Sequence, residues 1–115
     1  MKTNSNKSKD VEVIVLGSKG QLGSEWLEVL NHKGVHVVGF SSEELDITDF
    51  EKVAKLVTEL KPNLLINCTA YTNVDKAEQE WGKALEINAH AVGNLAQICK
   101  LNEIKLVHFS TDYVF

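Results

Sequence analysis

The sequence predicts an α/β fold, a doubly wound parallel sheet with helices on both faces. Short runs of β-branched and other apolar residues alternate with longer segments of helical spacing, and a glycine-rich segment joins the first run to the first helix. Right-handed crossovers leave few topologies open, and we expect the strand order 3-2-1-4. In that order strand one is internal and strand four is an edge, and we expect the chain to stop after strand four of a longer sheet.

Four runs of the sequence are expected strands: Val11–Leu16, Val35–Phe40, Leu64–Cys68 and Lys105–Phe109. The third is mostly apolar, as a strand covered on both faces should be. Because a helical segment separates each strand from the next, the strands are expected to run parallel.

Three helical segments lie between these strands. Apolar residues recur at helical spacing from Gln21 to His32. Thr48 or Asp49 is expected to cap a second helix that ends before the proline of the sequence. A third helical region runs from about Val74 to Leu101, with Trp81–Gly82 as a candidate break.

Composition limits the chain to a few classes of protein. Its 115 residues suit one small domain, and 43% hydrophobic with 24% charged residues is ordinary for a soluble globular protein. The net charge of −4 includes no strongly basic run, so a nucleic-acid role has no electrostatic footprint. No apolar run approaches the roughly 18 residues of a membrane span. We expect a cytoplasmic protein with residues 1–10 as a flexible polar leader, reduced thiols at Cys68 and Cys99, and no metal site.

The segment after the first strand, GSKGQLG at 17–23, has a Gly-x-x-Gly-x-x-Gly spacing. Gly17 permits a tight turn, Gly20 lets backbone amides approach a pyrophosphate, and Gly23 lets the helix pack closely on the strand. The helix that follows directs its free N–H groups and positive dipole end toward an anion. Because this segment opens a βαβ unit, we prefer dinucleotide binding by a Rossmann-like domain over residues 11–115 to a purely structural turn.

The end of the second strand usually selects the dinucleotide, because an acidic residue there binds the ribose hydroxyls of NAD. Here Ser41 and Ser42 precede Glu43 and Glu44, and the small hydroxyls leave room for a 2′-phosphate. Lys19 is available as a cation. We therefore expect NADP(H) or NAD(H) as cofactor, with a slight preference for NADP(H).

Three further segments carry a family resemblance: LDITD at 45–49, NCTAYTNVDKAE at 67–78 and STDYVF at 110–115. Together with GSKGQLG they resemble the extended short-chain dehydrogenase/reductases, and within them the family of dTDP-4-dehydrorhamnose reductases. The resemblance covers nearly everything after residue 10. It implies NAD(P)H-dependent reduction of the 4-keto group of dTDP-4-dehydrorhamnose to dTDP-L-rhamnose. It further implies a nucleotide sugar as small-molecule partner and a homodimer in complete relatives.

The resemblance also implies roles for individual residues. Thr111 would be catalytic, because it hydrogen-bonds the substrate carbonyl, and Asp112 would contact the sugar. Asn88 would support the proton relay. The expected cofactor contacts are Gly20, Gln21 and Leu22 at the pyrophosphate, Asp46 and Ile47 beside the adenine, and Ala70, Tyr71 and Thr72 along the ribose and nicotinamide. Gly17 and Gly23 of the glycine loop are also expected among the cofactor-binding residues.

The chain departs from the family pattern in two ways. Cys68 replaces a small alanine, which we interpret as a packing variant. More seriously, the family's acid is a tyrosine with a lysine four residues later, and 1–115 contains no such pair. Since that lysine is needed to lower the pKa of the tyrosine, we expect this chain to bind cofactor with little or no turnover. Two alternatives stay open: a non-catalytic dinucleotide-binding regulatory subunit of a metabolic enzyme, and a reductase of another nucleotide sugar.

Overall fold

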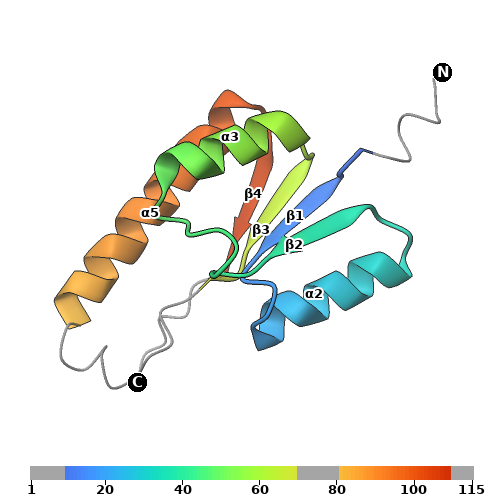
Figure 1. Cartoon of the computed structure of the whole chain (residues 1–115), viewed down its shortest axis with the longest axis horizontal. Helices are drawn as coiled ribbons and strands as arrows, with labels where there is room; N and C mark the ends of the chain where they lie inside the picture. The colour runs from blue at the N-terminus through green and yellow to red at the C-terminus, as the bar shows by residue number, and fades with distance from the viewer. Residues whose placement is uncertain (1–9, 70–80, 110–115) are drawn as a thin grey trace.

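The computed structural model describes the backbone of residues 10–69 and 81–109, and the side chains of 10–69 and 90–109. Its four strands are β1 (Val13–Leu16), β2 (Val37–Phe40), β3 (Leu64–Asn67) and β4 (Lys105–His108). All pair in parallel in one sheet, and their carboxyl ends lie at the same end of the molecule (Figure 1). The predicted fold class is confirmed.

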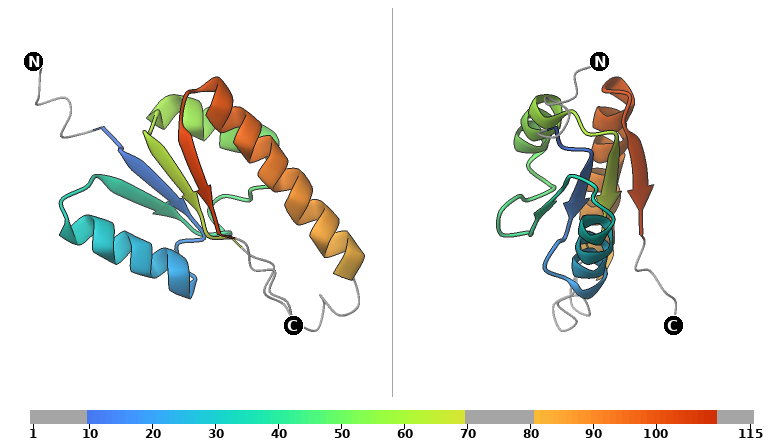
Figure 2. Two further views of the ribbon diagram at one scale, coloured as in Figure 1. Left: turned by 180° about the vertical axis from the view of Figure 1, so that it is seen from behind. Right: turned by 90° about the vertical axis from the view of Figure 1, so that its right-hand side faces the viewer.

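The strand order is β2-β1-β3-β4, so the expected order 3-2-1-4 is wrong. The third strand pairs with β1 instead of β2, and β4 pairs with β3. Burial gives the physical reason. β3 is almost entirely apolar and buried, whereas β2 is half-buried along its length and β4 is mostly exposed. Placing the two most apolar strands side by side in the middle removes the most apolar surface from water. β4 is an edge, as expected, opposite β2 (Figure 2).

Of the helices in the described part of the chain, α3 (Phe50–Leu60) begins at a side-chain cap and α2 (Gln21–His32) does not. α2 has the predicted bounds. α3 begins after Asp49, whose carboxylate accepts a hydrogen bond from the Lys52 amide, so Asp49 and not Thr48 is the cap. α5 (Trp81–Leu101) is described from the position of the candidate break, and the expected helical residues before it lie outside the described part of the chain.

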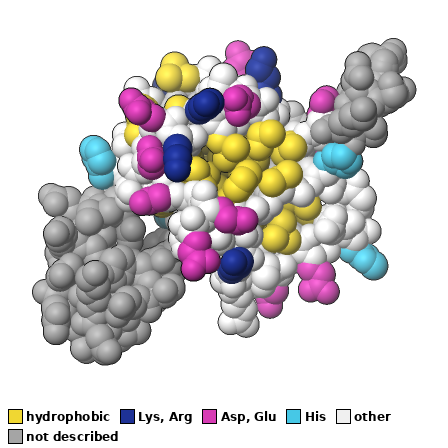
Figure 3. Space-filling model, viewed as in Figure 1, with side chains coloured by type: hydrophobic (Ala, Val, Ile, Leu, Met, Phe, Trp, Pro, Cys, Tyr) yellow, Lys and Arg dark blue, Asp and Glu magenta, His cyan; other side chains and the backbone are white. Residues whose placement is uncertain are grey.

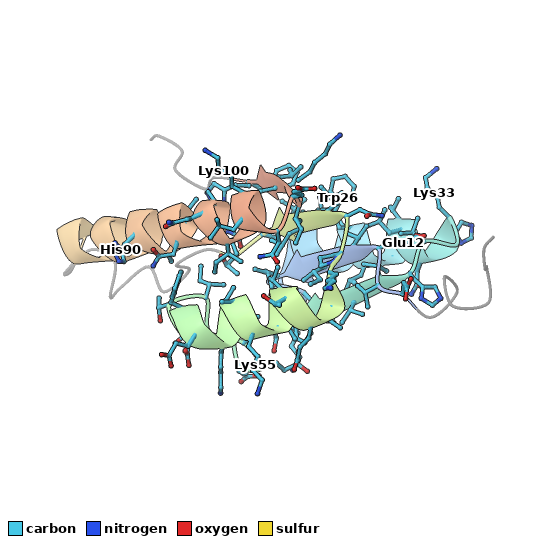
Figure 4. All side chains as sticks on the ribbon, turned by 90° about the horizontal axis from the view of Figure 1, so that it is seen from above. Glu12, Trp26, Lys33, Lys55, His90 and Lys100 are labelled. Atoms are coloured by element: carbon cyan, nitrogen blue, oxygen red, sulfur yellow. The ribbon has the colours of Figure 1, made fainter. Side chains whose placement is uncertain are left out.

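Two apolar layers hold the helices to the sheet. On one face α3 and α5 lie side by side over the strands (Figures 1 and 4). On the other face α2 packs against β1 and β2. Figure 3 shows hydrophobic side chains at the surface of the molecule, over the strands between α3 and α2. The first layer is built on Ile14, Leu16, Leu45, Val53, Val57, Leu65, Leu95, Ile98, Cys99 and Ile104, and the second on Val13, Val15 and Ile66.

The cap of α3 yields a first prediction. Replacing Asp49 with Ala removes the acceptor of the Lys52 amide and should lower the free energy of unfolding by about 1 kcal/mol. Asp49→Asn is the matched control, because an asparagine oxygen caps equally well. Urea unfolding followed by circular dichroism measures both variants. Equal losses for Ala and Asn would show that the cap contributes nothing.

Candidate dinucleotide-binding site

The candidate site lies at the carboxyl ends of the strands, where the chain changes direction across the sheet. From β1 the chain passes outward to β2, then returns to the other side of β1 to form β3. A doubly wound sheet binds its ligands in the crevice at such a point. The glycine loop after β1, the turn after β2 and the first residues after β3 all meet there (Figure 1).

Folding alone requires two of the three loop glycines. Gly17 has φ +80°, and a Cβ on it would lie 2.9 Å from the carbonyl carbon and oxygen of Cys68. Gly23 is buried at the start of α2, where a Cβ would overlap the carbonyl oxygen of Gly17. Any larger residue at either position forces backbone apart, so these two glycines carry no information about a ligand.

Gly20 is different, because nothing in the described fold requires a glycine there. Its backbone is ordinary, with φ −76° and ψ 170°, and a Cβ on it would meet only the carbonyl oxygen of Gly17, at 3.5 Å. It is also the N-cap of α2, a position that favours Ser, Thr, Asn or Asp, yet no side chain caps this helix. An acidic residue in the first turn is absent as well. The first amides of α2 are therefore open to an external anion.

The turn after β2 contains an acidic residue that already has a structural task. Ser41 is buried, its amide donates to Glu44 Oε1 over 2.8 Å, and the Glu44 amide donates to Ser41 Oγ over 3.3 Å. This reciprocal pair has the pattern of a capping box but closes a turn here, and the hydrogen bonds from Ser41 lower the pKa of the Glu44 carboxyl. Of the two serines expected to leave room for a phosphate, only Ser42 is exposed.

Lys19 and Glu43 form an ion pair between the glycine loop and the turn after β2. Their charged atoms, Nζ and Oε1, lie 3.5 Å apart, and both side chains are largely exposed. An exposed pair of this kind stabilises a fold very little. Its interest lies in its position, because it joins the glycine loop to the turn after β2, which we expect to select the cofactor.

Asp46 and Ile47, expected beside the adenine, sit in the loop between this turn and α3. Asp46 Oδ1 accepts hydrogen bonds from the amide of Thr48 at 2.9 Å and from its hydroxyl at 2.7 Å. These bonds lower the pKa of the Asp46 carboxyl and fix its direction. Ile47 packs partly buried against the α3–α5 layer. Thr48, considered above as a helix cap, instead orients Asp46.

At the end of β3 the structure reveals a polar residue that sequence reasoning missed. Asn67 is fully buried and hydrogen-bonds Thr69 and His108. Its only signal in the sequence is a polar residue at the end of an apolar strand. The neighbouring Cys68 is half-buried, and burial raises the pKa of its thiol, as it does for Cys99.

Several predicted site residues cannot be placed. Ala70, Tyr71, Thr72, Thr111 and Asp112 lie outside the described residues, and the side chain of Asn88 does so too. Gly20, Gln21 and Leu22 are exposed at the opening, as ligand contacts must be. Within the described residues no cluster of His, Cys, Asp or Glu is arranged to hold a metal ion. The described helices include none long and apolar enough to cross a membrane.

Comparison with known proteins agrees with this geometry. Curated relatives include the dTDP-4-dehydrorhamnose reductase of Streptomyces griseus, 39% identical over 102 residues that cover 89% of this chain and 34% of that protein. A protein of Haloferax volcanii named as a probable low-salt glycan biosynthesis reductase is 43% identical over 111 residues, covering 88% of this chain and 37% of that protein. The chain thus spans about a third of the length of the curated relatives it matches.

Solved structures of reductases are also similar to this chain. The dTDP-4-dehydrorhamnose reductase of Bacillus anthracis, in complex with NADP, superimposes with a TM-score of 0.80 at 42% identity, over 92% of this chain and 38% of that one. The corresponding reductase of Clostridium acetobutylicum also gives 0.80, at 41% identity over 91% of this chain and 38% of that one. The family model described as the RmlD substrate binding domain matches residues 11–115. The chain therefore belongs to the RmlD substrate binding domain family.

Proposed function

We propose that this chain is the dinucleotide-binding part of a reductase that uses NADP(H), or secondarily NAD(H), to reduce the 4-keto group of dTDP-4-dehydrorhamnose. The observation that carries the proposal is Gly20, a glycine that the fold does not need, at an uncapped helix start. The NADP complex of the Bacillus anthracis relative supports the choice of cofactor. We place this activity in the cytoplasm, with a nucleotide sugar as the small-molecule partner and a homodimer as the assembly.

The described residues would bind the dinucleotide mainly through backbone atoms. Gly20 would let the pyrophosphate approach closely, and the amides of Gln21 and Leu22, with the dipole of α2, would hold it. The Gly20 amide itself donates to the Gly17 carbonyl over 3.1 Å. Asp46, already oriented by Thr48, would lie with Ile47 beside the adenine. When bound, the nicotinamide supplies the hydride for the reduction.

We propose that the remaining contacts follow β3 and β4. Ala70, Tyr71 and Thr72 would line the ribose and nicotinamide. Thr111 would hydrogen-bond the keto oxygen and polarise the carbonyl, and Asp112 would bind the sugar. These roles rest on the family resemblance.

Gly20→Ala tests the pyrophosphate site. A methyl group at the N-cap of α2 should weaken NADPH binding at least about tenfold, because it hinders the approach of a charged group whose hydrogen bonds are among the stronger ones. The chain should still fold, since the methyl has room and the change from a glycine to an alanine cap costs about 1 kcal/mol. Isothermal titration with NADPH measures the affinity. Gly93→Ala, in an exposed stretch of α5 where a methyl meets nothing within 4 Å, is the matched control. Unchanged affinity in Gly20→Ala would refute the site.

Substitutions of Lys19 and Glu43 test whether this pair determines the preference between NADPH and NADH. Lys19→Ala should weaken NADPH binding about two- to fivefold and leave NADH binding unchanged, since only NADPH carries the extra phosphate. Glu43→Gln should strengthen NADPH binding, because it removes a negative charge and frees Lys19. Fluorescence titrations at low salt measure both. Lys33→Ala, at the far end of α2 (Figure 4), is the charge-matched control. Parallel changes for NADH and NADPH would contradict this assignment.

Turnover tests the reaction itself. We expect the 115-residue chain, mixed with NADPH and dTDP-4-dehydrorhamnose, to oxidise NADPH slowly, because it has no Tyr-x-x-x-Lys pair to donate the proton. Absorbance of NADPH follows the reaction, and product analysis identifies dTDP-L-rhamnose. Rates of about 1 s⁻¹ or more, in the ordinary range for enzymes, would show that another group in the chain supplies the proton.

A further inference from the structure

Asn67 joins two strand ends at the candidate site. It is the last residue of β3 and is fully buried, in register with Leu16 of β1 and His108 of β4. Its Oδ1 accepts hydrogen bonds from the Thr69 amide at 3.1 Å and the Thr69 hydroxyl at 2.7 Å. Its Nδ2 lies 3.1 Å from Nδ1 of His108.

These contacts determine which way the Asn67 amide points. The backbone N–H of Thr69 can only donate, so the atom that faces it must be the amide oxygen of Asn67. The amide nitrogen then faces His108 and can only donate. Nδ1 of His108 must therefore accept, which places the imidazole proton on Nε2.

We propose that Asn67 is a positioning residue for the dinucleotide, and that it holds His108 as the neutral Nε2–H tautomer. Through Thr69 it fixes the backbone that leads directly to Ala70, the first of the expected ribose and nicotinamide contacts. Through His108 it fixes the end of the strand that leads to Thr111. One buried amide thus holds Thr69 and the end of β4 at a set separation. The positioning role rests on the proposed function, whereas the tautomer does not.

Asn67→Asp separates the two contacts of this residue. A carboxylate of the same shape still accepts from Thr69, but it cannot donate to His108. His108 must then present Nδ1–H, either as the other tautomer or as the imidazolium. A complementary test changes the other partner of this hydrogen bond, His108, which is exposed and therefore tolerant of substitution. In His108→Asn the amide oxygen can replace Nδ1 as acceptor, and in His108→Leu no acceptor remains.

Nitrogen NMR of the imidazole tests the tautomer without any cofactor. The protein at neutral pH should show His108 with the proton on Nε2, and Asn67→Asp should move a proton to Nδ1. A proton on Nδ1 in the unmodified protein would overturn the assignment.

Titration with NADPH tests the positioning role. Asn67→Asp and His108→Leu should each bind NADPH roughly two- to tenfold more weakly, the range for one lost hydrogen bond, while His108→Asn stays near the unmodified protein. Asn102→Asp is the control for charge, because its amide bonds the Ile98 carbonyl at the opposite end of the sheet. If Asn67→Asp does not fold, the two His108 variants decide.

The outcomes distinguish the two proposals. Unchanged affinity in Asn67→Asp and His108→Leu, with binding intact in the unmodified protein, would overturn the positioning role alone. An equal loss in Asn102→Asp would also overturn it, because the effect would then come from charge. Absence of NADPH binding in the unmodified protein would overturn the proposed function and the positioning role together, and would leave the tautomer standing.

Discussion

The close approach of two backbone segments, at Gly17 and at Cys68, is the constraint on which the rest of this structure depends. The Cys68 amide donates to the carbonyl of Leu16, and the Gly17 amide donates to the carbonyl of Phe40. Three strands are therefore joined at the point where β1 ends. The start of α2 rests directly on the Gly17 carbonyl through Gly23. Because all of these are backbone contacts, the direction of the α2 dipole is fixed by geometry that side-chain motion cannot relax.

This arrangement divides the candidate site into a rigid part and a variable part. The pyrophosphate region is formed by backbone groups at the start of α2, so its chemistry changes little with sequence. The rim is formed by exposed side chains, Lys19, Ser42 and Glu43, that the fold leaves free. Glu44 looks equivalent to Glu43 in the sequence, but its carboxylate is held by the Ser41 amide. In the proposed site, the choice of dinucleotide would therefore depend on fewer residues than the number of acidic side chains suggests.

Local sequence patterns predicted the helices and strands well, but they did not predict which strands lie next to each other in the sheet. The bounds of α2 and one of the two candidate caps of α3 followed from apolar spacing and capping preference, both of which act within a few residues. Strand order depends on which surfaces meet across the sheet, and alternation alone does not reveal that. The apolar character of β3 contained the information, because a strand buried on both faces belongs in the interior.

The same distinction applies to the site. The glycine spacing was readable because its three positions are close in the chain, although only the structure separates Gly20 from the two glycines that packing requires. The contact between Asn67 and His108 joins residues 41 positions apart, and no local pattern predicts it. Capping preference left Thr48 and Asp49 as alternatives, and only the structure shows that Asp49 is the cap and that Thr48 bonds Asp46. Ala70, Tyr71, Thr72, Thr111 and Asp112 remain predictions from resemblance.

The freedom at Gly20 also determines how natural selection acts on this loop. A substitution at Gly17 or Gly23 lowers the amount of protein in the cell, because the altered chain misfolds and is degraded. A substitution such as Gly20→Ala gives a chain that still folds, at a cost of about 1 kcal/mol, and its main defect is in binding the proposed ligand. Surveys of variants scored by protein abundance would therefore rank position 20 well below 17 and 23, whereas a screen for binding would rank it with them. In a lineage that no longer used the dinucleotide, Gly20 would be among the first residues of the loop to drift.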